Sequence, residues 1–472
     1  MAASIFWYDY ETTGIDPRCD RPLQVAGLRT DHQLNVIDEP VNIYCRPSDD
    51  ILPHPAACRI TGITPQILEA RGISEAAFMA RVHEQLARPG TCGAGYNTLR
   101  FDDEVTRYSL YRNFYDPYAR EWQGGNSRWD LIDVVRAAYA LRPDGIEWPH
   151  RDGQVSLKLE ALASANGLEH GQAHDALCDV HATIALAKLI RERQPKLFDW
   201  LFQLRGKRAV TDQIHLMQPL VHISGRFSAA RSYLGVVLPL AWHPVNRNAL
   251  IVCDLHLDPS VLWEVEPEVL AQRLYTRREE LAQGELPVPL KLIHVNRCPV
   301  IAPMAVLREQ DRERLGLDMA QLKQRADALA NAACDWPSLL AEVYRNNGFP
   351  ASEDPEQQLY DGFIGDRDRR LCDQIRSASA SALVNSEWIF DDARLAELLW
   401  RYRARNFPGS LSEAEQQRWH AFCRSRLVDA RQGAPHTLSQ FDIALAEYQL
   451  AEEPVLQQWA VHVQGIRERF GL

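Results

Sequence analysis

An apolar run near the start of the chain ends in an Asp-x-Glu pair and is stopped at once by a turn. Residues 6–11 read FWYDYE, and the turn sequence Thr-Thr-Gly follows directly. Residues two apart in a β-strand share a face and lie roughly 6.6 Å apart along it, so Asp9 and Glu11 point the same way. Two carboxylates on one face repel each other unless a cation lies between them, and hard divalent metals prefer oxygen ligands. Taken alone, the pair is better explained as a strand end that happens to be acidic, so its meaning depends on the rest of the chain.

Two further acidic segments follow the pair. Residues 95–104 read GYNTLRFDDE, in which a short strand breaks and an acidic helix begins. Residues 174–179 read HDALCD and open an amphipathic run to Arg193, whose apolar residues recur every three or four positions and indicate a helix. Each segment alone has a simpler explanation, because acids complement a helix N-terminus and Asp175 suits an N-cap. The three segments in this order are a much narrower signal.

The acids of these segments suit the hydrolysis of a phosphodiester by two metal ions. Asp9, Glu11, Asp102 and Asp179 are the expected ligands of two ions about 4 Å apart, the clamp used for in-line displacement. A neutral His174 is the candidate acceptor of the proton of the attacking water, because imidazole titrates near neutral pH. Asp103 is an alternative to Asp102 as a ligand.

With these residues the chain resembles the DEDDh exonucleases, which share a ribonuclease-H-like fold and cleave nucleic acids from 3′ ends. Within that group it is similar to the bacterial exonuclease I family. The similar segments are residues 9–12 (DYET), 59–65 (RITGITP), 95–107, 111–118 (YRNFYDPY), 127–133 (SRWDLID) and 402–409 (YRARNFPG). They span nearly the whole chain, which a shared nuclease domain alone would not require. Position within the family motif favours Asp102 over Asp103 as the metal ligand.

The chain divides into three parts. The first alternates strand-like and helical runs, as in an α/β domain, with strands expected at residues 4–10, 24–30 and 41–45. Residues 216–303 are β-rich, with strands expected at 221–223, 235–242, 249–255 and 290–295, and the chain is helical from about Asp354 to its end. The resemblance implies a multidomain α/β protein: a ribonuclease-H-like α/β domain, a small Src-homology-3-like β-barrel and a C-terminal all-α domain, at residues 1–190, 195–350 and 351–472. In that family the three domains form a C-shaped wrap around single-stranded DNA.

Composition indicates an ordinary soluble, cytoplasmic protein. Ten cysteines are scattered without a Cys-x-x-Cys pair, which argues against a zinc site or a disulfide framework and suits a reducing compartment. We find no signal peptide and no apolar run long enough to span a membrane. The net charge of −11 excludes broad electrostatic coating of DNA but permits a focused groove. Residues 191–208, with six basic and two acidic side chains, are one basic stretch, although a solvated helix end explains it equally well.

Basic and aromatic residues interleave between residues 107 and 136, a combination that suits single-stranded nucleic acid. Packing explains Trp129, which precedes an apolar pair. The resemblance favours DNA contact for four others, which are Arg107, Tyr118, Trp122 and Arg136. It also places Lys158 where the family has an arginine near the terminal phosphate. Because lysine lacks the bidentate fork of arginine, the role of Lys158 is less well defined. The expected substrate-binding residues are Glu11, Lys158, Arg107, Tyr118, Trp122 and Arg136.

The leading interpretation is a 3′→5′ exonuclease specific for single-stranded DNA, which releases 5′-mononucleotides and acts in DNA repair and recombination. The expected cofactor is Mg²⁺, two ions per active site, with Mn²⁺ as a substitute. The resemblance also implies a monomer that docks the acidic C-terminal tail of single-stranded DNA-binding protein. One alternative is a proofreading or RNA-trimming exonuclease, although about 280 residues beyond Asp179 argue against a compact member of that group. Another is a non-catalytic single-stranded-DNA-binding protein, although such a protein has no physical reason to keep repelling carboxylates together.

Overall fold

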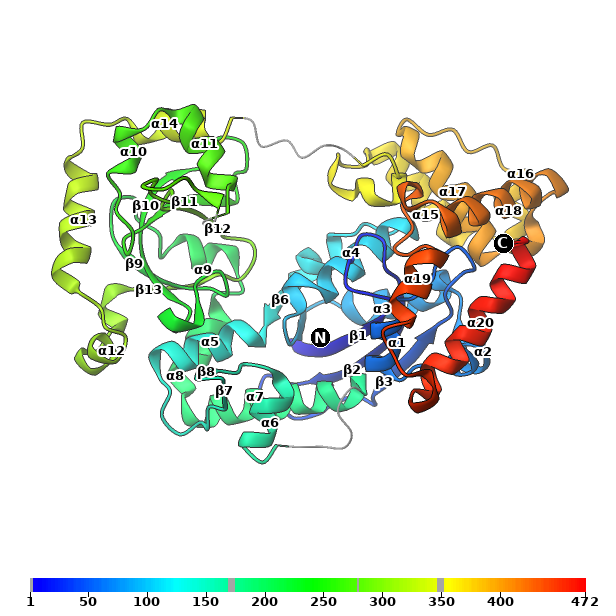
Figure 1. Cartoon of the computed structure of the whole chain (residues 1–472), viewed down its shortest axis with the longest axis horizontal. Coiled ribbons are helices and arrows are strands. Elements are labelled where there is room, and N and C mark those ends of the chain that lie inside the picture. Colours follow the sequence, from blue (N-terminus) through cyan, green and yellow to red (C-terminus); the bar gives the residue numbers. More distant parts are fainter. Residues whose placement is uncertain (1–2, 169–174, 278–279, 346–351) are drawn as a thin grey trace. The chain divides into compact units, whose positions relative to one another are not determined.

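The computed structural model describes residues 3–168, 175–277, 280–345 and 352–472 (Figure 1). The chain forms two compact units, each assembled from separate segments. The first unit consists of Met1–Ser127, His170–Ile184 and Pro350–Leu472, and the second of Arg128–Glu169 and Ala185–Phe349. The first unit therefore unites both ends of the chain.

The sheet of the first unit contains the strand that carries the acidic pair. Its strands are β1 (Ser4–Thr12), β2 (Pro22–Thr30), β3 (Val41–Cys45), β4 (Gly72–Ile73) and β5 (Thr91–Gly95). They lie in the order β4-β3-β2-β1-β5, with β1 antiparallel to β2 and parallel to β5. The pairing of β1 with β2 has an irregularity between Glu11 and Thr12. Such bulges bend a strand and re-aim its side chains, and they are common beside active sites.

Helices from both ends of the chain complete the first unit (Figure 1). The N-terminal part contributes α1 (Pro55–Thr61), α2 (Pro65–Arg71), α3 (Glu75–Leu86) and α4 (Asp102–Arg112). The C-terminal part contributes η7 (Pro355–Tyr360), α15 (Asp366–Ser377), α16 (Ala380–Asn385), α17 (Ala393–Asn406), α18 (Glu413–Val428), α19 (Leu438–Leu445) and α20 (Pro454–Phe470). One buried apolar cluster joins Leu52 and Ile63 to Phe441 and Trp459, and another joins Tyr111 to α15 and α17. The two ends of the chain thus share their cores.

The second unit is built on an antiparallel sheet. Its strands are β9 (Leu220–Ile223), β10 (Leu234–Trp242), β11 (Ala249–Asp254), β12 (Leu290–His294) and β13 (Val300–Pro303), in the order β12-β11-β10-β9-β13. A separate hairpin pairs β7 (His150–Arg151) with β8 (Gln154–Val155). The helices are α5 (Leu131–Leu141), α6 (Leu159–Ala165), α8 (Pro195–Gln203), α9 (Lys207–Thr211), α10 (Val261–Glu264), α11 (Pro267–Tyr275), α12 (Glu309–Arg314), α13 (Met319–Asn331) and α14 (Trp336–Val343). Two elements contain residues of both units, β6 (Ser127–Asp130) and α7 (Ala176–Arg193).

The structure confirms the expected strands to within two residues at each end, and the helix expected to end at Arg193 is α7. Trp129 is 3% exposed and packs edge-on against Phe198 and Phe202, so its assignment to the core is confirmed. Three helices, α12 to α14, lie where the sequence pattern assigned none. No helix among the described residues is long and apolar enough to cross a membrane. The division into three domains at the stated boundaries stays a prediction.

Candidate active site

Three carboxylates from two elements meet at the end of β1. Asp9 and Glu11 lie on one face of the strand, and Asp179 lies in the first turn of α7. One ligand oxygen from each of the three lies within 4.8 Å of the others. A single cation can therefore contact all three side chains, as the alternation along β1 and the acidic start of α7 predicted.

The start of α7 presents Asp179 to this cluster. The side chain of Asp175 caps the helix, accepting hydrogen bonds from the backbone N–H groups of Leu177 (2.9 Å) and Cys178 (3.3 Å). Asp179, one turn later, donates its backbone N–H to the Asp175 carbonyl (3.0 Å). Acidic side chains are favoured in this first turn because of the helix dipole. His174, the candidate general base, lies outside the described residues, so its role stays a prediction.

The turn after β1 is held by the carboxylate of Asp20. The Thr13 hydroxyl donates to Asp20 Oδ1 (2.7 Å), and the Asp16 N–H donates to Asp20 Oδ2 (2.9 Å). A Cβ on Gly14 would lie 2.5 Å from Asp20 Oδ2, a distance that no side chain tolerates. Glycine at this position therefore permits the close approach that fixes the chain immediately after Glu11.

Asp102 and Asp103 differ in their partners at the start of α4. Asp102 is 4% exposed and accepts a hydrogen bond from the Tyr10 N–H (3.0 Å), between the two acids of β1. Asp103 instead accepts from the Tyr8 hydroxyl (2.6 Å) and forms a buried ion pair with Arg120 (2.5 Å). The charge of Asp103 is thus neutralised within the protein. This geometry favours Asp102 as a metal ligand.

The carboxyl groups of the site have raised pKa values. Burial, followed by the charge of Asp179, raises the pKa of Asp9 from 3.8 to about 8. Burial and the charges of Asp9, Asp179 and Asp175 raise the pKa of Glu11 from 4.5 to about 9. Burial and Asp9 also raise the pKa of Asp102 well above its usual range. Crowded acids with strongly perturbed pKa values are typical of functional sites, and an all-oxygen donor set of this kind fits a hard divalent cation.

The structure gives Arg107 protein partners at every polar end of its guanidinium. The side chain is 6% exposed and forms ion pairs with Glu121 (2.7 Å) and Glu104 (2.8 Å). It also donates to the Tyr360 hydroxyl (2.9 Å). In this conformation Arg107 joins α4 to the C-terminal part of the first unit, and its contact with a DNA phosphate stays a prediction.

Arg136 and Lys158 belong to the second unit. Arg136 forms an ion pair with Asp133 one turn earlier (2.7 Å), and its guanidinium lies 5.7 Å from the ring centre of Tyr233. Lys158 is exposed at the N-terminus of α6, and its side chain caps no backbone group there. The predicted contact of Lys158 with the terminal phosphate stays a prediction.

Two predicted stacking residues differ in exposure. Trp122 is 67% exposed. Tyr118 is half-buried beside a cavity of about 330 Å³, and its ring lies 5.9 Å from that of Phe363, which is 82% exposed. Sequence analysis did not single out Phe363. An aromatic residue between glycines, in the stretch YDGFIG of residues 360–365, is the signal that indicates an exposed ring there.

Comparisons with known proteins agree over the whole chain. Family models described as "Exonuclease", "Exonuclease I SH3-like domain" and "Exonuclease I C-terminal domain" match residues 6–187, 205–346 and 353–464. The chain is 49% identical to exodeoxyribonuclease I of Escherichia coli strain K12 over 420 residues, 88% of each protein. The structure of exonuclease I from Methylocaldum szegediense matches with a TM-score of 0.94 at 46% identity, covering 98% of this chain and all of the other. The zinc-bound form of the E. coli exonuclease I complex with single-stranded DNA matches with a TM-score of 0.91 at 44% identity, covering 99% of this chain and all of the other.

Proposed function

Because the chain belongs to the exodeoxyribonuclease I family, we propose that Asp9, Glu11, Asp102 and Asp179 bind two Mg²⁺ ions that cleave DNA. The protein is a divalent-metal-dependent exodeoxyribonuclease that degrades single-stranded DNA in the 3′→5′ direction. The observation that carries the metal assignment is the meeting of Asp9, Glu11 and Asp179 within 4.8 Å. Mn²⁺, an ion of similar ligand preference, is the expected substitute.

The metal ions and the residues around them have separate proposed roles. When bound, two ions would lower the pKa of the attacking water and would stabilise the leaving oxygen. Asp9 and Glu11 hold their carboxylates on one face of β1, and Asp102 is fixed against the strand by the Tyr10 N–H. Glu11, at the irregular end of the strand, is also proposed to contact the substrate. His174, five residues before Asp179 in the sequence, is proposed as the acceptor of the water's proton.

The single strand is proposed to follow two aromatic rings, one exposed and one half-buried, away from the metal site. Trp122 and Tyr118 offer faces on which unpaired bases stack, and bases within a duplex are already stacked. Lys158 is proposed to bind a phosphate near the 3′ terminus as a point charge. Arg136 and Arg107 carry protein ion pairs, so direct phosphate contacts by them would require these pairs to exchange.

Membership of the family also supports proposals about the protein's location, oligomeric state, pathway and partners. We propose that the protein is a cytoplasmic monomer acting in DNA repair and recombination, with domains at residues 1–190, 195–350 and 351–472. The acidic C-terminal tail of single-stranded DNA-binding protein is the proposed protein partner. An acidic peptide complements a basic surface, which raises the rate of association.

The proposal is tested by measuring nucleotide release from labelled single-stranded DNA, with and without magnesium, for the wild type and two variants of α7. Asp179→Asn removes one proposed ligand and is expected to abolish release. Glu192→Gln removes an exposed carboxylate at the far end of the same helix and is expected to leave release unchanged. Metal-independent release, or near-normal turnover by Asp179→Asn, would refute the metal assignment. Preference for labelled RNA would favour the RNA-trimming alternative.

A further inference from the structure

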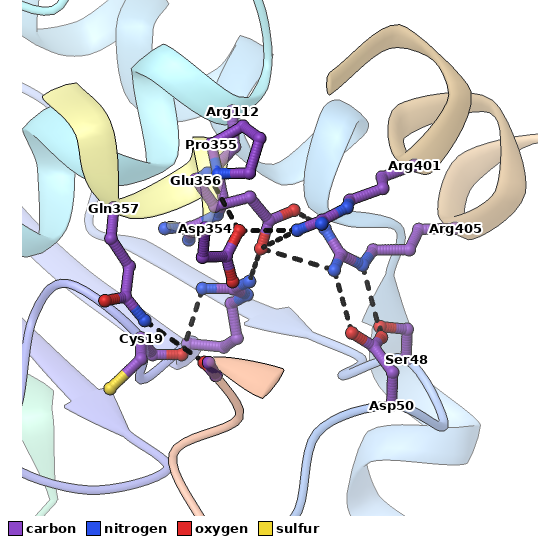
Figure 2. Close-up of polar contacts among 12 residues, drawn as sticks. Cys19, Ser48, Asp50, Arg112, Asp354, Pro355, Glu356, Gln357, Arg401 and Arg405 are labelled. Carbon is purple, nitrogen blue, oxygen red and sulfur yellow. Dashed lines mark hydrogen bonds and ion pairs between the residues drawn. The ribbon is translucent and has the colours of Figure 1, made fainter. Parts of the chain in front are cut away.

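A cluster of buried charges joins the two ends of the chain within the first unit (Figure 2). It contains four arginines and three acids, which we call the buried ion-pair cluster: Arg21, Asp50, Asp354, Glu356, Arg401, Arg405 and Arg426. Asp50 and Arg426 are fully buried, and Glu356 is 2% exposed. Burying so many charges is costly unless each is paired. The fold therefore has to hold these side chains in positions where every charge keeps its partner.

Glu356, in η7, is the acid shared by both ends of the chain. One of its carboxylate oxygens accepts from Arg21 Nη2 (2.5 Å), and the other forms an ion pair with Arg405 of α17. Burial alone would raise the pKa of Glu356, but the surrounding arginines outweigh it and hold the pKa well below its usual range. Figure 2 shows Glu356 and Asp50 facing the same Arg405 guanidinium. Glu356 is thus an anion whose position is fixed from both sides.

Arg21 connects this cluster to the turn that follows Glu11. The backbone N–H of Arg21 donates to the Thr13 hydroxyl, and the backbone N–H of Thr13 donates to the Arg21 carbonyl, both at 2.9 Å. The Thr13 carbonyl accepts from the His54 N–H (2.7 Å), and Thr13 is fully buried. Every polar group of Thr13 is therefore bound, two residues after a proposed metal ligand.

We propose that Glu356 is a positioning residue for the metal site. Through the Arg21 guanidinium and the paired backbones of Arg21 and Thr13, it fixes the end of β1 and with it the Glu11 carboxylate. The site needs this support because the strand is irregular at Glu11 and because neighbouring carboxylates repel Glu11 until a cation is bound. The C-terminal part of the chain thereby contributes to metal binding at a site whose ligands all lie outside it. This inference rests on the proposed function, since it concerns the affinity of the same metal site.

The test compares two charge-neutralising variants of the full-length protein. Glu356→Gln removes the ion pairs with Arg21 and Arg405, whereas Asp354→Asn removes buried ion pairs with Arg401 and Arg426 and leaves Arg21 untouched. Mn²⁺ affinity is measured by isothermal titration calorimetry, and the magnesium concentration for half-maximal nucleotide release is measured in parallel. We expect Glu356→Gln to lower the Mn²⁺ affinity roughly tenfold and to raise the magnesium concentration for half-maximal release by a similar factor. This is the lower end of the losses seen when groups that orient metal ligands are removed. Affinity for single-stranded DNA in EDTA is expected to be unchanged, and thermal denaturation records the stability lost by each variant.

Two results would overturn the inference. One is unchanged Mn²⁺ affinity in Glu356→Gln, and the other is an equal loss of affinity in Asp354→Asn at a matched loss of stability. If Glu356→Gln does not fold, Arg21→Lys makes the same comparison, because lysine keeps the charge but not the fork that spans Glu356 and the Cys19 carbonyl. A wild type without metal-dependent nucleotide release would contradict the proposed function instead, so the two failures are distinguishable.

Discussion

Replacing Asp9 by asparagine is expected to abolish DNA cleavage and, at the same time, to stabilise the metal-free protein. The substitution removes one of the crowded carboxylates and keeps the shape of the side chain. Asparagine has no negative charge to hold a cation at this position, so nucleotide release should be lost. The gain in stability follows from the pKa of Asp9, which burial and Asp179 raise from 3.8 to about 8.

The sign and size of the gain follow from proton linkage. A carboxyl group whose pKa is raised on folding gives stability that is fully present below its unfolded-state pKa and is lost as pH rises toward the folded-state value. For Asp9 the loss runs from about pH 4 to about pH 8, at no more than about 1.4 kcal/mol per pH unit. The largest gain in the free energy of unfolding that Asp9→Asn can give is on the order of 5 kcal/mol. Partial exposure of Asp9 to solvent lowers our expectation of this gain to about 2–3 kcal/mol.

The assay is denaturant unfolding in EDTA at several pH values between about 5 and 8. The wild-type free energy of unfolding should fall with rising pH more steeply than that of Asp9→Asn. At the alkaline end the variant should melt higher, by about 1–2 °C for each kcal/mol gained. Magnesium should stabilise the wild type, because it binds the folded state, and should have much less effect on the variant. Parallel pH profiles in EDTA, or a variant less stable than the wild type at pH 8, would refute the reasoning.

Three other substitutions separate functional from structural side chains. Asp102→Asn should abolish cleavage with little loss of stability. Asp103→Asn should cost about 3–5 kcal/mol in denaturant unfolding, because it breaks the closest ion pair of buried Arg120. Equal stability of the two variants would contradict this. Trp122→Ala should weaken binding of single-stranded DNA in EDTA by about 1–3 kcal/mol and leave the circular dichroism spectrum unchanged, and unaltered affinity would exclude stacking. His174→Ala should slow single-turnover cleavage by roughly 10²–10⁴-fold with little change in Mn²⁺ affinity, and a normal rate would exclude its role as a general base.

The sequence predicted the local elements of the site because their signals are short-range. An apolar run predicts the strand at residues 4–10, and the two-residue period of a strand places Asp9 and Glu11 on one face. Apolar spacing identifies α7, and an acidic first turn identifies the start of α4. Each signal depends on neighbours within a few positions, which propensity and periodicity describe well.

The sequence could not separate residues that differ only in their distant partners. Asp102 and Asp103 are adjacent acids at one helix start, and distant partners distinguish them: the Tyr10 N–H for Asp102, and the Tyr8 hydroxyl and Arg120 for Asp103. The phosphate contact of Arg107 stays a prediction, and nothing local in the sequence indicates that Tyr360, about 250 residues away, accepts from its guanidinium. Glu356 gave no sequence signal for the same reason. Tertiary contacts decide whether a charge is free for a ligand or bound within the protein.

The net charge of −11 is a sum over the whole chain and does not show where the charges lie. Some acids face arginines inside the protein, as Asp50 faces Arg405. Others surround the proposed metal site, where bound cations would neutralise them. Overall charge therefore says little about the surface that meets DNA, which depends on where individual cations and aromatic rings are exposed.

The central claim is tested most directly by the end from which a single strand is degraded. Oligonucleotides blocked at either the 3′ or the 5′ end, and a blunt duplex of the same sequence, are incubated with the wild type and magnesium, and the released products are resolved. We predict that the 5′-blocked single strand is degraded to 5′-mononucleotides, and that the 3′-blocked strand and the duplex persist. Degradation of the 3′-blocked strand, or equal release from the duplex, would contradict the account.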